Sequence, residues 1–203
     1  TEATRKIESR YWDPVTINSK GDRQTHEGAF GPDLFQQTAV DFVRKHKDRP
    51  FVFYHAMPLV HGQNMKVHVV STPDNRAAPP ADEHAAFADM LRYADKQVGA
   101  LVHELEVLDL MKRTIVIVAS DNGTERTLSA RANGRLVQGG LYQINEAGGD
   151  VALIAYSPDV IPAGRTGALA DFTDILPTIC DFAGVAIPKN VVLDGKSQAD
   201  YLR

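Results

Sequence analysis

Cysteine is almost absent from the sequence, because Cys180 is the only one among 203 residues. A single thiol excludes a disulfide within the chain and a cysteine-rich zinc site. Cys180 lies in the apolar segment 175–183, so we expect it to be a small buried residue rather than a nucleophile.

The sequence also lacks a long apolar run and an excess of basic residues. No run approaches the length that crosses a bilayer, so we expect no membrane span. The formal net charge of -4 and the pI of about 5.9 argue against a nucleic-acid partner, which requires a basic surface. The chain begins at Thr1 rather than at methionine, so the absence of a targeting segment is uninformative. A hydrophobic content of 43% supports the core of one domain or of part of one.

An apolar strand that ends in polar residues is the most distinctive feature present. Residues 114–119 are mostly β-branched, and Ser120-Asp121-Asn122-Gly123 follows directly. Open α/β sheets place their chemistry at the carboxyl ends of such strands. Asp121 and Asn122 offer carboxylate and amide oxygens, which are the ligands that Ca²⁺ or Mg²⁺ prefers. The same residues are typical of a simple turn, so this segment alone leaves both interpretations open.

A second short apolar run, residues 51–57, predicts an interior strand. His61 follows this run, in a position equivalent to that of Asp121. A histidine there is a candidate general acid, a contact for a phosphate or sulfate group, or a metal ligand, and a surface loop histidine is the alternative. His55 lies inside the run, and we expect it to be a core histidine with a backbone partner.

The other elements indicate an α/β fold. Helices are predicted over residues 33–47, over 82–105 and over 169–182, with Asp33 and Asp82 as N-caps of the first two. In the third, Pro177 implies a kink or a restart, and Gly184 ends the helix. Residues 151–156 predict another strand, and the proline-rich residues 65–81 predict a loop long enough to be a lid or binding loop. Strands that alternate with helices predict a sheet, mostly parallel or mixed, flanked by helices.

The predicted strands are few for a chain of this length, so we expect the sheet to be incomplete. We predict one partial α/β domain over residues 1–203, with an irregular lead-in at 1–30, a core at 31–185 and a tail at 186–203. The lead-in is interpreted as a loop, an edge strand pair or a piece whose partners are missing. An exposed sheet edge invites pairing with another chain, so a homo-oligomer through that edge is one expectation.

In their order and spacing these segments resemble the sulfatase family, within the alkaline phosphatase superfamily. The resemblance covers most of the chain from about Phe30 onward, including the predicted core. It is carried by residues 49–54 with the histidine that follows the strand, by 87–99, by 114–123, by 139–148, by 164–178 and by the closing segments 183–185 and 193–195.

The resemblance implies a calcium ion at the strand ends, held by two acidic residues of a first strand and by an Asp-Asn pair that Asp121 and Asn122 match. It also implies an active-site position for His61. The family's nucleophile is a formylglycine made from Cys or Ser in a Cys/Ser-x-Pro-x-Arg signature, and its hydrated form attacks the sulfur of a sulfate ester. The implied substrates are small-molecule or glycan sulfate esters, and the implied location is periplasmic or secreted.

The sequence departs from the family pattern at positions that concern activity. It contains no Cys/Ser-x-Pro-x-Arg, and the first strand with its acidic pair has no counterpart. Both normally lie upstream of the matched region, so we expect the C-terminal portion of a sulfatase-like protein, inactive alone and with at most weak Ca²⁺ affinity. Leu141 stands where a lysine is common, and Asp150 and Ala152 stand where a basic residue and a proline are usual. Even a complete parent protein could therefore be impaired, altered in substrate or inactive.

Three functions remain open from the sequence. The first is a sulfuric ester hydrolase, and the second is a non-catalytic sulfatase-like module, which Leu141 and the missing signature motivate. The third is a relative in the same superfamily that acts on phosphate esters or phosphonates. Such relatives commonly bind two zinc ions through several Asp and His ligands, whereas Asp121 and Asn122 fit one hard cation better.

Overall fold

The structure is a computed structural model that describes residues 10–62 and 70–203. It divides into two compact units, and each is described by itself. Unit 1 comprises Thr1–Leu108 and Asn122–Asp150, and unit 2 comprises Asp109–Asp121 and Val151–Arg203. One of the three points at which the chain passes between the units is therefore the peptide bond that joins Asp121 to Asn122.

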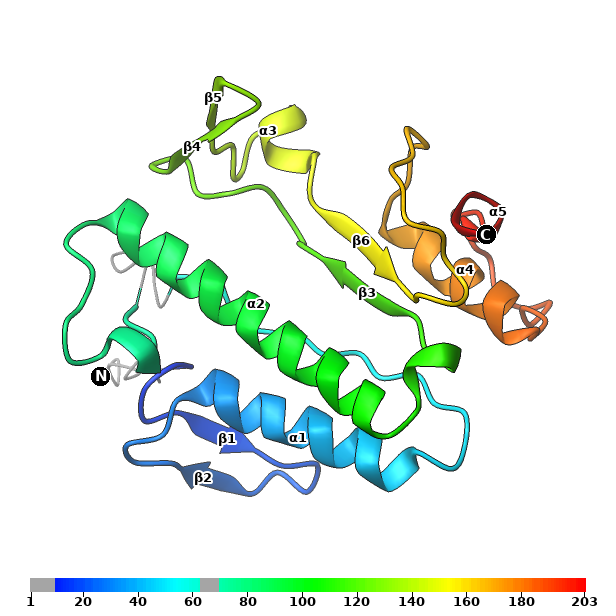
Figure 1. Cartoon of the computed structure of the whole chain (residues 1–203), viewed down its shortest axis with the longest axis horizontal. Helices are drawn as coiled ribbons and strands as arrows, with labels where there is room; N and C mark the ends of the chain where they lie inside the picture. Colours follow the sequence, from blue (N-terminus) through cyan, green and yellow to red (C-terminus); the bar gives the residue numbers. More distant parts are fainter. Residues whose placement is uncertain (1–9, 63–69) are drawn as a thin grey trace, which may run out of the picture. The chain divides into compact units, whose positions relative to one another are not determined.

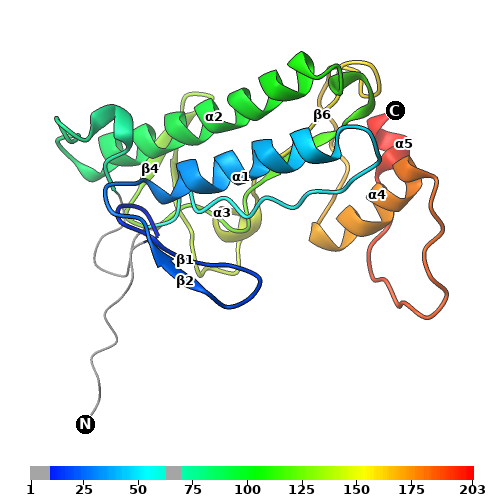
Figure 2. The ribbon, with the colours of Figure 1, turned by 90° about the horizontal axis from the view of Figure 1, so that it is seen from below.

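Two long helices form the framework of unit 1. They are α1 (Gly31–His46) and α2 (Glu83–Val107), and they lie side by side in both ribbon views (Figures 1 and 2). Asp82 caps α2 as predicted, because its side chain accepts a hydrogen bond from the Ala85 amide. The prediction that Asp33 caps α1 is wrong, since Phe30 is the N-cap residue and Asp33 lies in the first turn. An acidic side chain in the first turn is still favourable to the helix dipole.

An aromatic cluster forms the core of unit 1. Tyr11, Phe30, Val70, Met90 and Tyr93 are buried together. The Phe30 ring meets the Tyr93 ring edge to face, with centroids 5.5 Å apart. Such pairs add about 0.5–1.5 kcal/mol to the free energy gained from burial alone. The cluster therefore ties the segment before α1 to the middle of α2.

Residues 51–57 are extended but do not form the predicted interior strand among the described residues. Their burial alternates, so that Phe51 and Phe53 pack against Phe42 of α1 while Val52 and Tyr54 are exposed on the other side. This pattern is typical of an edge strand with one covered face, because alternate side chains of an extended chain point to opposite faces.

His55 is half-buried in this extended segment. Its Nε2 atom is buried and has no hydrogen-bond partner among the described residues, so the predicted backbone partner is not found for that atom. Burial lowers the pKa of His55, which favours the neutral ring.

Two short hairpins complete the strands of unit 1. In the predicted lead-in, β1 (Val15–Ile17) pairs with β2 (Arg23–Thr25), so the edge strand pair is the interpretation that holds there. Further along, β4 (Ser129–Ala132) pairs with β5 (Arg135–Gln138). The predicted loop 65–81 lies partly outside the described residues. Its described part contains the 3₁₀ turn η1 (Pro73–Asn75), and the one-turn helix α3 (Glu146–Gly149) follows the second hairpin.

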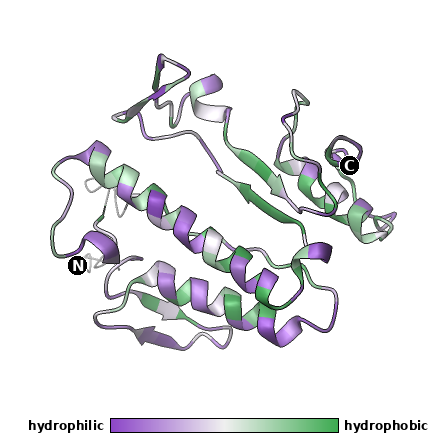
Figure 3. Ribbon diagram, viewed as in Figure 1, coloured by the Kyte–Doolittle hydropathy of each residue, from purple (hydrophilic) through white to green (hydrophobic). Residues whose placement is uncertain are grey.

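Unit 2 is built on a two-stranded antiparallel ribbon. Strand β3 (Val116–Ala119) pairs with β6 (Leu153–Tyr156), and both strands are coloured apolar in Figure 3. They lie within the predicted strand segments. Yet Leu153, Ile154 and Tyr156 are exposed rather than buried. Every strand pair in the described residues is antiparallel, so the predicted parallel neighbours are not among them.

The C-terminal part of unit 2 is helical. The 3₁₀ turn η2 (Met111–Arg113) precedes β3, and η3 (Phe172–Asp174) leads into α4 (Ile175–Ala183), which Gly184 ends in the left-handed conformation as predicted. Pro177 falls in the first turn of α4, where its missing N–H is tolerated, so the predicted restart is what occurs. Helix α5 (Ala199–Leu202) closes the chain. No helix in the described part of the chain is long and apolar enough to cross a membrane.

Candidate functional site

The polar strand end at Asp121 and Asn122 is held by main-chain hydrogen bonds on both sides. In unit 2, the Ser120 amide donates to the Ala152 carbonyl at 3.2 Å, which extends the β3–β6 ladder to the last residue before Asp121. In unit 1, the Gly123 amide donates to the Gly148 carbonyl at 2.9 Å. Both Asp121 and Asn122 are exposed. Their backbone is thus fixed by its neighbours while the side chains stay accessible to a ligand.

Four glycines let the chain after Asn122 pack directly on the turn before β6, an arrangement that we call the glycine clamp: Gly123, Gly139, Gly140 and Gly148. A Cβ atom on Gly123 would lie 2.1 Å from the Ala147 carbonyl oxygen. A Cβ atom on Gly148 would lie 2.0 Å from the Gln143 carbonyl oxygen. Because these contacts are with backbone, no side-chain rotation could relieve them. Glycine is therefore required in segment 139–148 because backbone atoms approach these positions too closely for a side chain.

Replacing Gly123 with alanine is expected to destabilise unit 1 by about 1–3 kcal/mol, because an extra methyl group in a closely packed place forces the backbone to shift. Gly149→Ala is the matched control, since nothing lies within 4 Å of the position of its Cβ atom. Urea denaturation followed by circular dichroism measures both variants. Equal stability of the two would show that the close approach at Gly123 does not constrain the fold.

Leu141 lies within the glycine clamp. Its amide donates to the Thr124 carbonyl at 3.0 Å, two residues after Asn122. Leu141 is therefore joined by a hydrogen bond to the segment that carries Asn122, a candidate metal ligand. A leucine side chain there supplies no positive charge to an anionic group.

His61 lies in unit 1, beyond the extended segment 51–57, and is exposed. Its Nδ1 atom is 2.5 Å from the Gly62 carbonyl oxygen. A carbonyl can only accept, so Nδ1 carries the proton in the neutral ring and Nε2 keeps its lone pair. Nε2 could therefore accept a proton, or donate one after the ring has been protonated.

Tyr11 fixes the backbone of His61. The single O–H of Tyr11 is shared between two carbonyl oxygens, that of Pro58 at 2.7 Å and that of His61. Burial raises the pKa of Tyr11, so its hydroxyl remains a donor at ordinary pH. The sequence does not predict this contact, because nothing in the local pattern around Tyr11 links it to a loop 50 residues away.

The side-chain oxygens at the end of β3 are of the type that binds a hard cation. Asp121 and Asn122 supply a carboxylate and an amide oxygen, whereas Ca²⁺ takes about 6–8 oxygen ligands. No group of three or more His, Cys, Asp or Glu side chains suited to a metal occurs within residues 10–62 and 70–203. Within these residues, Asp121 and Asn122 would supply only a small part of the ligand shell that such a cation takes.

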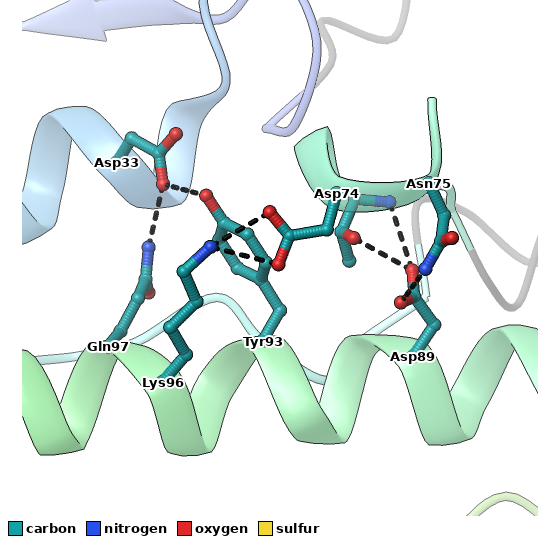
Figure 4. Close-up of polar contacts among 8 residues, drawn as sticks. Asp33, Asp74, Asn75, Asp89, Tyr93, Lys96 and Gln97 are labelled. Atoms are coloured by element: carbon teal, nitrogen blue, oxygen red, sulfur yellow. Dashed lines mark hydrogen bonds and ion pairs between the residues drawn. The ribbon is translucent and has the colours of Figure 1, made fainter. Parts of the chain in front are cut away.

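A polar network on α2 supports unit 1 (Figure 4). Asp89 is buried, and its Oδ2 atom accepts from the Thr72 hydroxyl at 2.8 Å and from the Thr72 amide at 3.3 Å. The Asn75 amide also donates to Asp89. One turn further along, Tyr93 and Gln97 both donate to Asp33 of α1, at 2.8 and 2.9 Å. The network joins η1 and α1 to the same face of α2.

The helices and strand pairs define an α/β protein, and comparison with known proteins identifies its family. The family model "Sulfatase" matches residues 7–185. Arylsulfatase A from Homo sapiens is 32% identical over 150 residues, which cover 73% of this chain and 28% of that protein.

Solved structures agree with this match. The PsFucS1 sulfatase from Pseudoalteromonas sp. superposes with a TM-score of 0.72 at 26% identity, covering 93% of this chain and 38% of that one. The structure of Ps i-CgsB in complex with k-i-k-neocarrahexaose superposes with a TM-score of 0.67 at 24% identity, over 88% and 40% of the two chains.

The chain belongs to the sulfatase family, and its fold is that of an alkaline-phosphatase-like α/β protein, as the sequence predicts. It spans 28% of the human arylsulfatase A and between 19% and 34% of other curated relatives that it matches.

Proposed function

We propose that this chain is the part of a sulfuric ester hydrolase that supplies His61, Asp121 and Asn122 to the active site. The formylglycine nucleophile and the acidic pair of the first strand would come from polypeptide outside this chain. The observation that carries the proposal is the exposed Asp121-Asn122 pair at the end of β3, followed by the glycine clamp.

Each residue has a distinct role in this proposal. Asp121 and Asn122 would hold a calcium ion together with the missing acidic pair, and the chemistry that a bound calcium supplies is that of a Lewis acid and a template. His61 would donate a proton from Nε2 to the leaving oxygen or neutralise charge on the sulfuryl group. The substrate would be a small-molecule or glycan sulfate ester. The protein would act in the periplasm or outside the cell.

Hydrolysis of an aryl sulfate tests the proposal. We expect no turnover by the purified chain alone, because the nucleophile signature is absent from its sequence. A full-length protein with an upstream Cys/Ser-x-Pro-x-Arg, expressed with the formylglycine-generating enzyme, should hydrolyse the ester and bind one calcium ion. Turnover by the chain alone would contradict the proposal. Two zinc ions in the full-length protein, with hydrolysis of phosphate esters or phosphonates, would instead favour the other branch of the superfamily.

A non-catalytic sulfatase-like module is the second candidate, and Leu141 is the observation that favours it. If the full-length protein is inactive and Leu141→Lys does not restore turnover, the module is the better description. If Leu141→Lys raises turnover, the hydrolase machinery is present and limited by the missing charge.

The ribbon of unit 2 motivates a further part of the proposal. A two-stranded sheet leaves one edge of β3 and one edge of β6 unpaired among the described residues. Exposed edges with apolar side chains favour pairing with another chain. We propose that the isolated chain self-associates through this ribbon, and sedimentation of the purified chain as a stable monomer would contradict this.

A further inference from the structure

The β4–β5 hairpin differs from the rest of the chain in charge. Its residues 129–138 contain Arg131 and Arg135 but no aspartate, glutamate or lysine, so they carry a charge of +2 in a chain whose net charge is -4, and Arg126 lies three residues before β4. All three arginines are exposed. No ion pair involves them in the described parts of the chain, although other basic residues, such as Arg44 and Lys96, are paired with acids.

The hairpin is firmly anchored at its base. Leu128, directly before β4, is buried, and its carbonyl accepts from the Gly139 amide at 2.9 Å and from the Gln138 side chain at 2.8 Å. The Ser129 amide donates to His84 Nε2 at 3.3 Å, which links β4 to α2. The basic side chains are therefore carried on an ordered arm, and less entropy is lost on binding than in a free loop.

The turn of the hairpin sets its shape. Asn133 and Gly134 both have positive φ, 51° and 78°, which gives the two-residue turn that matches the twist of paired strands. At about 3.4 Å per residue, four-residue strands extend the tip about 14 Å from the base. Both ends of the arm lead into the glycine clamp, which follows Asn122. The arm thus projects from the segment that carries a candidate metal ligand.

The two faces of the hairpin each combine one arginine with apolar surface. Arg131 lies opposite Leu136 in the register, and Arg135 lies on the other face, which Val137 shares. Leu136 is 66% exposed and Val137 is 49% exposed. A guanidinium group matches the oxygens of a sulfate ester in a forked geometry, and an apolar side chain suits the C–H face of a sugar ring.

We propose that the β4–β5 hairpin binds a glycan that carries several sulfate groups, with Arg131 and Arg135 each contacting a sulfate other than the one hydrolysed. This inference rests on the proposed function, from which it takes the sulfate ester class. A small monosulfate ester needs only one anion contact, whereas basic groups on both faces of an extended arm suit an oligosaccharide.

Calorimetric titration of the purified chain with a sulfated carrageenan hexasaccharide tests the hairpin. The double variant Arg131→Gln/Arg135→Gln is expected to weaken binding by about tenfold or more and to make the salt dependence of the affinity shallower, since two charge-assisted contacts are lost. Arg131→Lys/Arg135→Lys should lose part of the affinity, because the positive charge remains but the paired N–H donors of the guanidinium group are lost.

The control double variant is Arg92→Gln/Arg165→Gln, which removes the same charge from two other exposed sites. It should change the affinity by less than about twofold, and circular dichroism should show that all variants fold. Equal weakening by the control pair would overturn the proposal in favour of a general charge effect. So would equal binding of the desulfated hexasaccharide, tighter binding of single-stranded DNA, or no binding at all.

This experiment fails or succeeds separately from the proposed function, because it requires no turnover. Aryl sulfate hydrolysis by the full-length protein tests the hydrolase alone. If the ester is hydrolysed and the hairpin variants bind the hexasaccharide normally, only the role of the hairpin is refuted. If binding depends on the two arginines and no ester is hydrolysed, only the proposed function is refuted.

Discussion

Replacing Asp89 with alanine is expected to lower the free energy of unfolding by about 2–4 kcal/mol. Asp89 is 3% exposed, and its carboxylate accepts hydrogen bonds from the amide and from the hydroxyl of Thr72. Thr72 is itself fully buried. Each buried donor that loses its only partner costs about 1–3 kcal/mol. Asp89→Asn should also lower the free energy of unfolding, because the NH₂ group of the asparagine side chain would face groups that are themselves hydrogen-bond donors.

Asp95→Ala is the matched control for Asp89, since it removes an exposed carboxylate from the same helix. Its effect on stability should stay within about 0.5 kcal/mol. A double-mutant cycle that combines Asp89→Ala with Thr72→Val separates the hydrogen bond from other consequences of the substitution. A coupling energy near zero in urea denaturation would mean that the bond to Thr72 does not stabilise unit 1.

This network also shows where sequence patterns fail on α2. Periodicity places Leu91 on the apolar face, yet Leu91 is 53% exposed, while Asp89 and Gln97 are buried. The hydrophobic pattern does locate the helix and its N-cap, because both depend on local residues. It cannot locate buried polar partners, because Asp89 owes its burial to Thr72 and Gln97 to Asp33, which are distant in sequence.

The same limit applies to the candidate site. Apolar runs predict β3 and β6, and polar residues after such runs point to Asp121, Asn122 and His61. The hairpin β4–β5 goes unpredicted, although Asn133-Gly134 between short strands is a strong hairpin signal, because the surrounding residues look like a solvated loop. The antiparallel pairing of β3 with β6 is likewise beyond local patterns, since it depends on which strands are available as neighbours.

His61→Ala in the full-length protein is expected to lower kcat/KM for a sugar sulfate by about 10²–10⁴-fold, which is the usual contribution of a general acid. Nδ1 of His61 is committed to the Gly62 carbonyl, so Nε2 is the atom that can deliver a proton. His103→Ala is the control, because it removes an exposed histidine from α2. Tyr11→Phe should lower kcat/KM by a smaller factor, since it removes a hydrogen bond to the His61 backbone but leaves the imidazole ring in place.

The choice of substrate distinguishes proton donation from a structural role of His61. A nitrophenyl sulfate has a good leaving group that departs without protonation, whereas the alkoxide of a sugar does not. The loss caused by His61→Ala should therefore be much smaller for the nitrophenyl ester than for the sugar sulfate. The Tyr11→Phe loss should follow the same order, since Tyr11 acts through His61. Equal losses on both esters would mean that His61 does not protonate the leaving oxygen and instead neutralises charge on the sulfuryl group or supports the loop.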